Sequence, residues 1–115
     1  MSHLEKFLNY LSVEKQSSSH TIASYKLDIE QFISLMAGDL PDFDDWSRFG
    51  RDDARSYLQE LHKLELSKNS IARKLSGMRS FYKFLQLSGV VSSNPFMRLS
   101  PLDFHLIPLT NLQRH

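Results

Sequence analysis

The sequence of 115 residues has no cysteine, few glycines and prolines, and no long hydrophobic run. The absence of cysteine excludes disulfide bonds and thiolate metal sites. No apolar stretch approaches the length of about 18 residues that a membrane-spanning helix needs, so we predict no membrane partner. The N-terminus alternates charged and apolar residues and lacks the hydrophobic region of a secretory signal, which predicts a cytoplasmic protein.

Patterns typical of metal sites and of small enzymes are also missing. The five histidines are scattered, and none is paired with another ligand at metal-binding spacing. The paired aspartates at 44–45 and 52–53 are explained by an acidic loop and by the preference for negative charge at a helix start, rather than by a magnesium site. There is no glycine-rich phosphate loop and no nucleophile elbow. We therefore predict no metal, no cofactor and no catalytic residue.

Acidic and basic residues are unevenly distributed, although the formal net charge is only +1. Residues 28–65 hold ten acidic groups and four basic ones, whereas residues 67–102 hold six basic groups and no acid. Such asymmetry is typical of a nucleic-acid-binding surface. A dipolar surface without any partner produces the same pattern, so charge alone leaves both interpretations open.

Hydrophobic periodicity predicts four amphipathic helices, at about 2–15, at 19–37, from Asp52 to the mid-60s, and at 68–88. Strand signals are weak throughout, so the predicted fold class is all-α, a compact four-helix bundle. After the last helix, residues 90–115 contain three prolines and no helical period. We predict that these residues form a non-helical C-terminal tail or an interdomain linker.

Helix boundaries are predicted from residues with known end preferences. Ser18 and Ser67 are expected N-caps, because a serine hydroxyl can accept a hydrogen bond from a free amide of the first turn. Gly38 and Gly89 are expected just past helix ends, where glycine adopts a left-handed conformation at little cost. Between the second and third helices lies an acidic loop with three large aromatic residues that we expect to pack on the core, namely Phe43, Trp46 and Phe49.

The predicted helix 68–88 carries basic and short polar side chains opposite its apolar face. Lysine and arginine suit phosphates, and asparagine or arginine can read base edges in the major groove. A solvated helix face usually carries glutamate–lysine pairs four residues apart, and glutamate is absent here. This favours a polyanion partner, with a plain solvated surface as the alternative. The residues on this face are Asn69, Ser70, Arg73, Ser76, Arg79, Ser80 and Lys83.

The start of the predicted helix 19–37 offers a second set of groups suited to an anion. Hydroxyl groups of Ser18, Ser19, Thr21 and Ser24 and the imidazole of His20 surround free amides of a helix N-terminus. Such a terminus attracts negative charge. A serine cap followed by a surface turn explains the same residues, so this interpretation also stays open.

Two stretches, FLNYLSVEKQSSSHTIASYKLDIEQF and LSKNSIARKLSGMRSFYKFLQLSGVVSSNPF, resemble the N-terminal core-binding domain of Xer-type tyrosine recombinases and related phage integrases. The likeness covers about residues 3–99. Two features depart from the family pattern: Ser19 replaces a common proline, and the segment after Pro101 lacks the basic residues often seen in the family linker. The matching positions are Ser18 to Thr21, Tyr25, Asp28, Leu66–Ser67, Ile71 to Ser76, Arg79 to Tyr82 and Asn94–Pro95.

The resemblance implies that residues 1–89 form a four-helix SAM-like domain that serves as one jaw of a C-shaped clamp around DNA. The second and fourth helices would approach the major groove, and the first would contact a neighbouring recombinase protomer. The DNA-binding residues carried over from the family are His20, Thr21, Ser24 and Lys26 from the second helix, and Asn69, Ser70, Arg73, Lys74, Ser76 and Arg79 from the fourth.

In this family, the catalytic residues belong to a second, C-terminal domain, and the sequence contains none of them. We therefore expect a non-catalytic DNA-binding domain whose parent breaks and rejoins double-stranded DNA through a phosphotyrosine link during integration or recombination. Its expected partners are DNA, the parent's catalytic domain and neighbouring protomers. One alternative is a helical protein–protein interaction module whose basic face docks an acidic partner. Another is a small intact enzyme, which the missing catalytic set argues against.

Overall fold

The computed structural model describes residues 1–38 and 42–106, with side chains described up to residue 103. The described residues contain helices and no strand, which confirms the predicted all-α class. None of these helices has the length and apolar character needed to cross a membrane. The α-helices are α1 (His3–Val13), α2 (Ser19–Ala37), α3 (Arg51–Lys63) and α4 (Lys68–Leu87), and two short 3₁₀ helices are η1 (Trp46–Arg48) and η2 (Pro101–Leu106).

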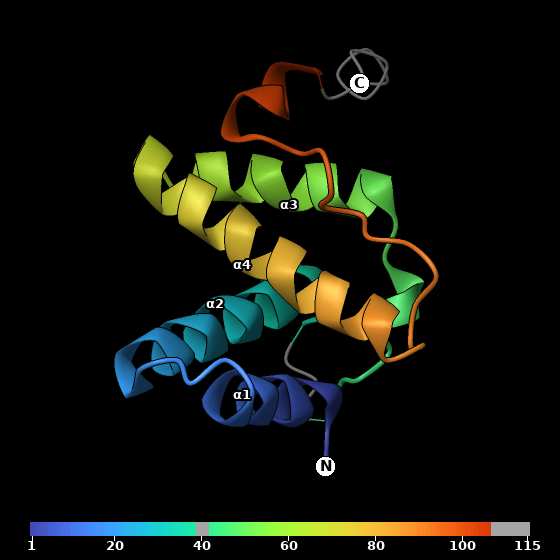
Figure 1. The fold of residues 1–115 in the computed structure, drawn as a ribbon. Helices are drawn as coiled ribbons and strands as arrows, with labels where there is room; N and C mark the ends of the chain where they lie inside the picture. The colour runs from blue at the N-terminus through green and yellow to red at the C-terminus, as the bar shows by residue number, and fades with distance from the viewer. Residues whose placement is uncertain (39–41, 107–115) are drawn as a thin grey trace.

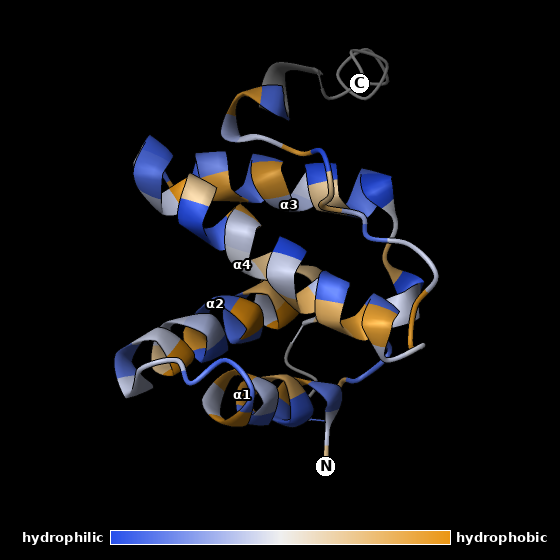
Figure 2. Cartoon of the chain, viewed as in Figure 1, coloured by the Kyte–Doolittle hydropathy of each residue, from blue (hydrophilic) through white to orange (hydrophobic). Residues whose placement is uncertain are grey.

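The four helices pack as two antiparallel pairs (Figure 1). α1 and α2 form one pair, and α3 and α4 form the other. α4 runs diagonally between α3 and the α1–α2 pair, and it contacts all three other helices. Each of the four α-helices carries both hydrophobic and hydrophilic positions, as Figure 2 shows. This is typical of helices that bury one face in a core.

The predicted helix ends are confirmed by local hydrogen bonds and dihedral angles. The hydroxyl of Ser18 accepts a hydrogen bond from the Thr21 amide, and that of Ser67 accepts one from the Ser70 amide, each at 3.1 Å. Gly38 follows α2 with φ of 78°, and Gly89 lies just past the C-cap of α4 with φ of 76°. Both values lie in the left-handed region, where a side chain would strain the backbone.

Aromatic rings fill the core. The ring of Phe32 on α2 meets four others edge-on or stacked, with its centroid 4.8 Å from Tyr57 and 5.8 Å from Phe96. The predicted inward packing of the loop rings is confirmed, since Trp46 is 1% exposed and Phe49 is 7% exposed, and Phe43 packs against them half-buried. The loop after α2 is thus a folded part of the core.

The packed core extends beyond the boundary predicted at residue 89. Phe96 is completely buried and Leu99 is nearly so. The sequence prediction had placed both residues in a tail outside the core. Arg79 fixes this segment to α4, because its Nε donates to the carbonyl oxygen of Phe96 at 3.0 Å and its Nη2 to that of Leu99 at 2.6 Å. Asn94 adds a third tie by donating to the Arg79 carbonyl at 3.0 Å.

The segment predicted as non-helical also contains the 3₁₀ helix η2, which packs on α3 and α4. A proline-rich sequence without helical period gave no sign of this turn. The rest of the predicted tail, residues 107–115, lies outside the described residues.

Truncating the buried ring of Phe96 (Phe96→Ala) is expected to lower the free energy of unfolding by about 3–5 kcal/mol, because it leaves a cavity between α2, α3 and α4. Urea unfolding followed by fluorescence of the single tryptophan measures the change. Met97 is the control: it is 53% exposed, so Met97→Ala should cost less than about 0.5 kcal/mol. Similar costs for the two variants would contradict the buried position of Phe96.

Candidate functional site

α2 and α4 approach each other closely at a glycine. A Cβ placed on Gly77 would lie 3.6 Å from the ring of Tyr25, so the ring lies against the backbone of α4. Three residues further along α2, the carboxylate of Asp28 reaches the same side of α4. α2 and α4 are therefore neighbours near the middle of each helix.

Asp28 links the helices through two consecutive cations. Its Oδ1 accepts a hydrogen bond from Lys74 Nζ at 2.8 Å and one from Arg73 Nη2 at 3.2 Å, and its Oδ2 accepts one from Arg73 Nε at 3.3 Å. The Asp28 and Lys74 side chains are 6% and 10% exposed, whereas that of Arg73 is 58% exposed. Two cations facing one carboxylate leave one positive charge, and Arg73 presents it to solvent.

This ion cluster is the feature that the sequence analysis missed. The family resemblance placed Lys74 among the DNA-binding residues, but it lies within the apolar stripe of α4, three residues after Ile71 and four before Met78. Asp28 occupies the equivalent place in the stripe of α2, three residues after Tyr25 and four before Phe32. The sequence did contain a signal for a buried ion pair, namely an acidic residue within the apolar stripe of one helix and a basic residue within that of another.

The phenol of Tyr57 on α3 lies close enough to Asp28 for the charge of that carboxylate to affect the pKa of the phenol. Burial raises the pKa of Tyr57 well above its usual value, and the charge of Asp28 raises it further. The ring is completely buried, and its hydroxyl has no hydrogen-bond partner among the described residues. Tyr57 therefore stays neutral and gives Asp28 no help, which leaves the two cations of α4 as the only charges that balance the carboxylate within the described residues.

The starts of α2 and α4 are built alike. In each helix the cap hydroxyl also donates to the hydroxyl three residues later, from Ser18 to Thr21 and from Ser67 to Ser70, at 3.0 Å. Neither first turn contains an acidic residue, whereas those of α1 and α3 do. The partial positive charge of both helix starts is therefore not neutralised by their own side chains. Both helices begin on the left in Figure 1.

Most of the predicted site residues lie at these two helix starts. Thr21 and Ser24 precede Asp28 by about two turns and one turn on the same face of α2, and His20 is exposed beside them. On α4, Asn69 lies one turn before Arg73, and Ser76 lies one turn after it. Asn69, Arg73 and Ser76 are exposed, and Ser70 is half-buried.

Three other predicted residues are buried, tied to the C-terminal segment, or on the α1 side of α2. Lys74 is buried against Asp28, and Arg79 is tied to the backbone of residues 96–99. Lys26 is exposed, but it lines a hollow of about 1030 Å³ between α1 and α2, together with Leu4. Periodicity assigns a residue to a helix face, and it does not identify the group that lies opposite.

Among the described residues, two carboxylates of the acidic region have partners away from the contact between α2 and α4. Asp44 is held near the start of α1, where its carboxylate accepts a hydrogen bond from the His3 amide and contacts His3 Nδ1 at 2.8 Å. It also accepts one from the indole of Trp46 at 3.1 Å. Asp53 caps α3 by accepting from the Gly50 amide at 2.8 Å. These carboxylates are occupied within the fold, away from the α2 and α4 starts.

The fold is a small helical domain in which the Asp28 cluster joins α2 and α4 and leaves the guanidinium of Arg73 partly in solvent. Residues 4–89 match the family model described as phage integrase, N-terminal SAM-like domain. The chain belongs to this family. No solved structure matches the chain at a significant level.

The chain is also similar to bacterial proteins named tyrosine recombinases. It is 44% identical over 93 residues to the tyrosine recombinase XerC of Anoxybacillus flavithermus, which covers 81% of this chain and 30% of that protein. It is 38% identical over 105 residues to XerC of Staphylococcus saprophyticus, covering 90% and 34%, and 38% identical over 94 residues to XerD of Chlorobaculum tepidum, covering 80% and 29%. The chain thus spans about a third of the length of these curated relatives.

Neutralising the buried carboxylate (Asp28→Asn) is expected to lower the free energy of unfolding by about 2–4 kcal/mol, because Lys74 then stays buried without a counter-charge. Urea unfolding followed by tryptophan fluorescence measures the loss. Glu30 provides the matched control, since Glu30→Gln removes an exposed carboxylate from the same helix and should change the free energy by less than about 0.5 kcal/mol.

The pairing itself is tested by combining Asp28→Asn with Lys74→Met. The double variant should lose less than the sum of the two single losses, because the two groups contact each other. Additive losses would mean that the carboxylate and the ammonium group do not stabilise each other.

Proposed function

We propose that this chain is a DNA-binding domain of a site-specific tyrosine recombinase and that the starts of α2 and α4 grip duplex DNA. The observation that carries the proposal is the Asp28 cluster, which joins the two helices and leaves the guanidinium of Arg73 facing solvent. Family membership and relatives named tyrosine recombinases support it. Its role in the parent is binding during DNA integration or recombination, and catalysis falls to a separate C-terminal domain.

The geometry supports a direct role for seven of the predicted residues. Hydroxyl, imidazole and amide groups at the two helix starts suit phosphate oxygens and base edges, and the unneutralised helix ends attract the backbone phosphates. A guanidinium can meet a phosphate or the edge of a guanine with two parallel hydrogen bonds. These seven residues are His20, Thr21, Ser24, Asn69, Ser70, Arg73 and Ser76.

The other three predicted residues act indirectly or at the margin in this proposal. Lys74 neutralises Asp28 and so positions Arg73. Arg79 holds the C-terminal segment on α4 and stabilises the domain. Lys26 adds long-range positive charge from the α1 side of α2. The contact of the first helix with a neighbouring protomer, and the docking of the parent's catalytic domain, stay predictions.

Removing the guanidinium of Arg73 (Arg73→Ala) is expected to weaken binding of a short labelled DNA duplex by about 1–3 kcal/mol. Fluorescence anisotropy over a series of salt concentrations measures both affinity and salt dependence. Three cations on the free surface of α4, namely Lys68, Arg73 and Lys83, predict a slope of log K against log salt of about −3, and the variant should reduce its size by about one.

Two control variants separate binding from folding. Lys6→Ala removes an exposed cation from α1 and should leave affinity unchanged within error. Arg79→Ala should lower the melting temperature, because two carbonyl groups lose a charged donor, whereas Arg73→Ala should lower it much less. Unchanged DNA binding in the Arg73 variant would refute the assigned surface. Equal competition by poly-L-glutamate of matched charge would favour a docking site for an acidic protein.

A further inference from the structure

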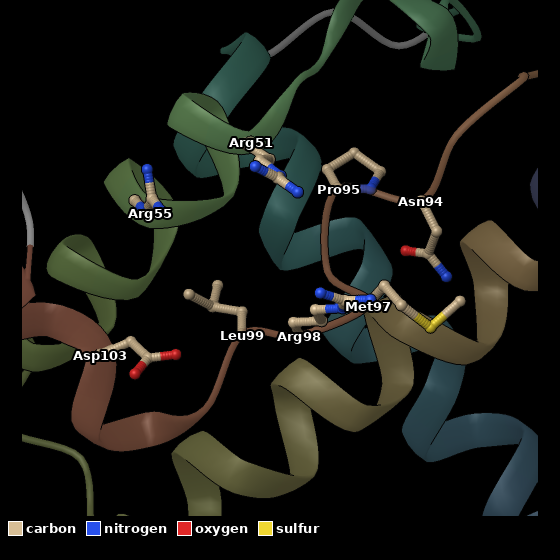
Figure 3. A pocket seen from close by; sticks show the side chains of 8 residues that line it. All are labelled: Arg51, Arg55, Asn94, Pro95, Met97, Arg98, Leu99 and Asp103. Carbon is tan, nitrogen blue, oxygen red and sulfur yellow. The ribbon is translucent and has the colours of Figure 1, made fainter.

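A second basic site lies on another part of the molecule, between the start of α3 and the segment that follows α4. A hollow of about 420 Å³ is lined there by three arginines, Arg51 and Arg55 from α3 and Arg98 from the C-terminal segment (Figure 3). Its volume is within the range of small-molecule sites. We propose that this hollow binds a phosphate group.

The arginines are incompletely neutralised within the fold. Asp103 is the one carboxylate that lines the hollow, and it accepts a hydrogen bond from the Ser100 amide at 2.8 Å. Arg51 and Arg98 form no ion pair with any described carboxylate, and Arg55 has a long one of 3.7 Å to the fully exposed Asp52. Three cations and one carboxylate leave the lining with two excess positive charges.

Other parts of the chain offer few groups that could supply the missing negative charge. Of the thirteen acidic side chains in the sequence, Asp39 alone lies outside the described residues. Residues 104–115 contain no aspartate or glutamate. Like charges held close together raise the energy of the free protein, and an anion that enters between them relieves this repulsion.

The position of Arg98 is fixed by the fold. It lies between Phe96 and Leu99, whose carbonyl groups are both held by Arg79, and the ring of Phe96 is buried in the core. Asn94 shapes the same turn by accepting a hydrogen bond from the Phe96 amide at 3.0 Å. The chain therefore holds Arg98 opposite the arginines of α3, and ligand binding need not order this segment.

The chemistry of the lining selects phosphate. Guanidinium groups are planar, always charged and able to make paired hydrogen bonds to phosphate oxygens. Apolar side chains of Pro95, Met97 and Leu99 share the hollow and reduce its exposure to water, which strengthens such bonds. The phosphate could belong to the DNA backbone or to a small phosphorylated molecule, and the hollow itself does not depend on the function proposed for α2 and α4.

The test uses the full chain and inorganic pyrophosphate as the probe. NMR titration at constant ionic strength should shift the side-chain Nε–H signals of Arg51, Arg55 and Arg98 by more than the Nε–H signal of Arg73 and the side-chain amide signals of Asn69. The double variant Arg51→Gln/Arg98→Gln should weaken binding about tenfold or more, because two charge-assisted contacts are lost. Lys6→Gln/Lys15→Gln removes the same charge from exposed positions outside the hollow and should bind as the unchanged chain does.

A second titration with duplex DNA identifies the source of the phosphate. Weaker DNA binding by the Arg51→Gln/Arg98→Gln variant, with a salt slope smaller by about two, assigns the hollow to the DNA backbone. Unchanged DNA binding with lost pyrophosphate binding assigns it to a small phosphorylated molecule. Equal responses of the two double variants to both probes would overturn the proposal. If the Arg73→Ala variant bound DNA as the unchanged chain does, only the function proposed for α2 and α4 would be refuted.

Discussion

The carboxylate of Asp28 constrains how α2 and α4 meet. It is almost completely buried, so its charge is tolerable only when cations lie against it. Lys74 supplies one from a buried position, and Arg73 supplies another while keeping much of its guanidinium in solvent. This fixes the rotation of each helix about its axis. Once the rotation is fixed, Arg73 lies at the edge of the α2–α4 contact with its guanidinium partly in solvent.

The cations of α4 divide into groups with different surroundings, although they follow one another closely in the sequence. Lys74 points into the core, and Arg73 lies at the edge of the α2–α4 contact. Arg79 is rotated away from both and ends on two carbonyl groups of the C-terminal segment. A count of basic residues therefore overstates the charge available to a polyanion. In the proposed DNA-binding role, the affinity of this surface would therefore depend on fewer cations, one of which, Arg73, is held by the buried carboxylate.

The C-terminal segment connects the core to the second basic site. Phe96 fills a gap among the rings of α2, α3 and α4, and Arg79 holds the backbone on both sides of Arg98. The same contacts that complete the core thereby bring Arg98 to the arginines of α3. Nothing in the sequence predicts this, because the segment has no helical period that would mark Phe96 as part of a buried face.

Local features were predictable from the sequence because their causes are local. Helical periodicity, serine caps at Ser18 and Ser67, and glycines after α2 and α4 depend on residues within one or two turns, and each is confirmed. The inward packing of Trp46 and Phe49 followed from their size and apolar character. The concentration of positive charge on α4 was likewise visible in the sequence alone.

Only the tertiary structure decided which side chains oppose one another. Asp28 and Lys74 are 46 residues apart, and Arg79 and Phe96 are 17 apart. Their contacts follow from the angle at which whole helices cross and from the path of the chain after α4. Periodicity specifies the direction of a side chain about its own helix and carries no information about the neighbour it meets. For this reason the sequence determined the helices and their faces, and packing determined which charges stay at the surface.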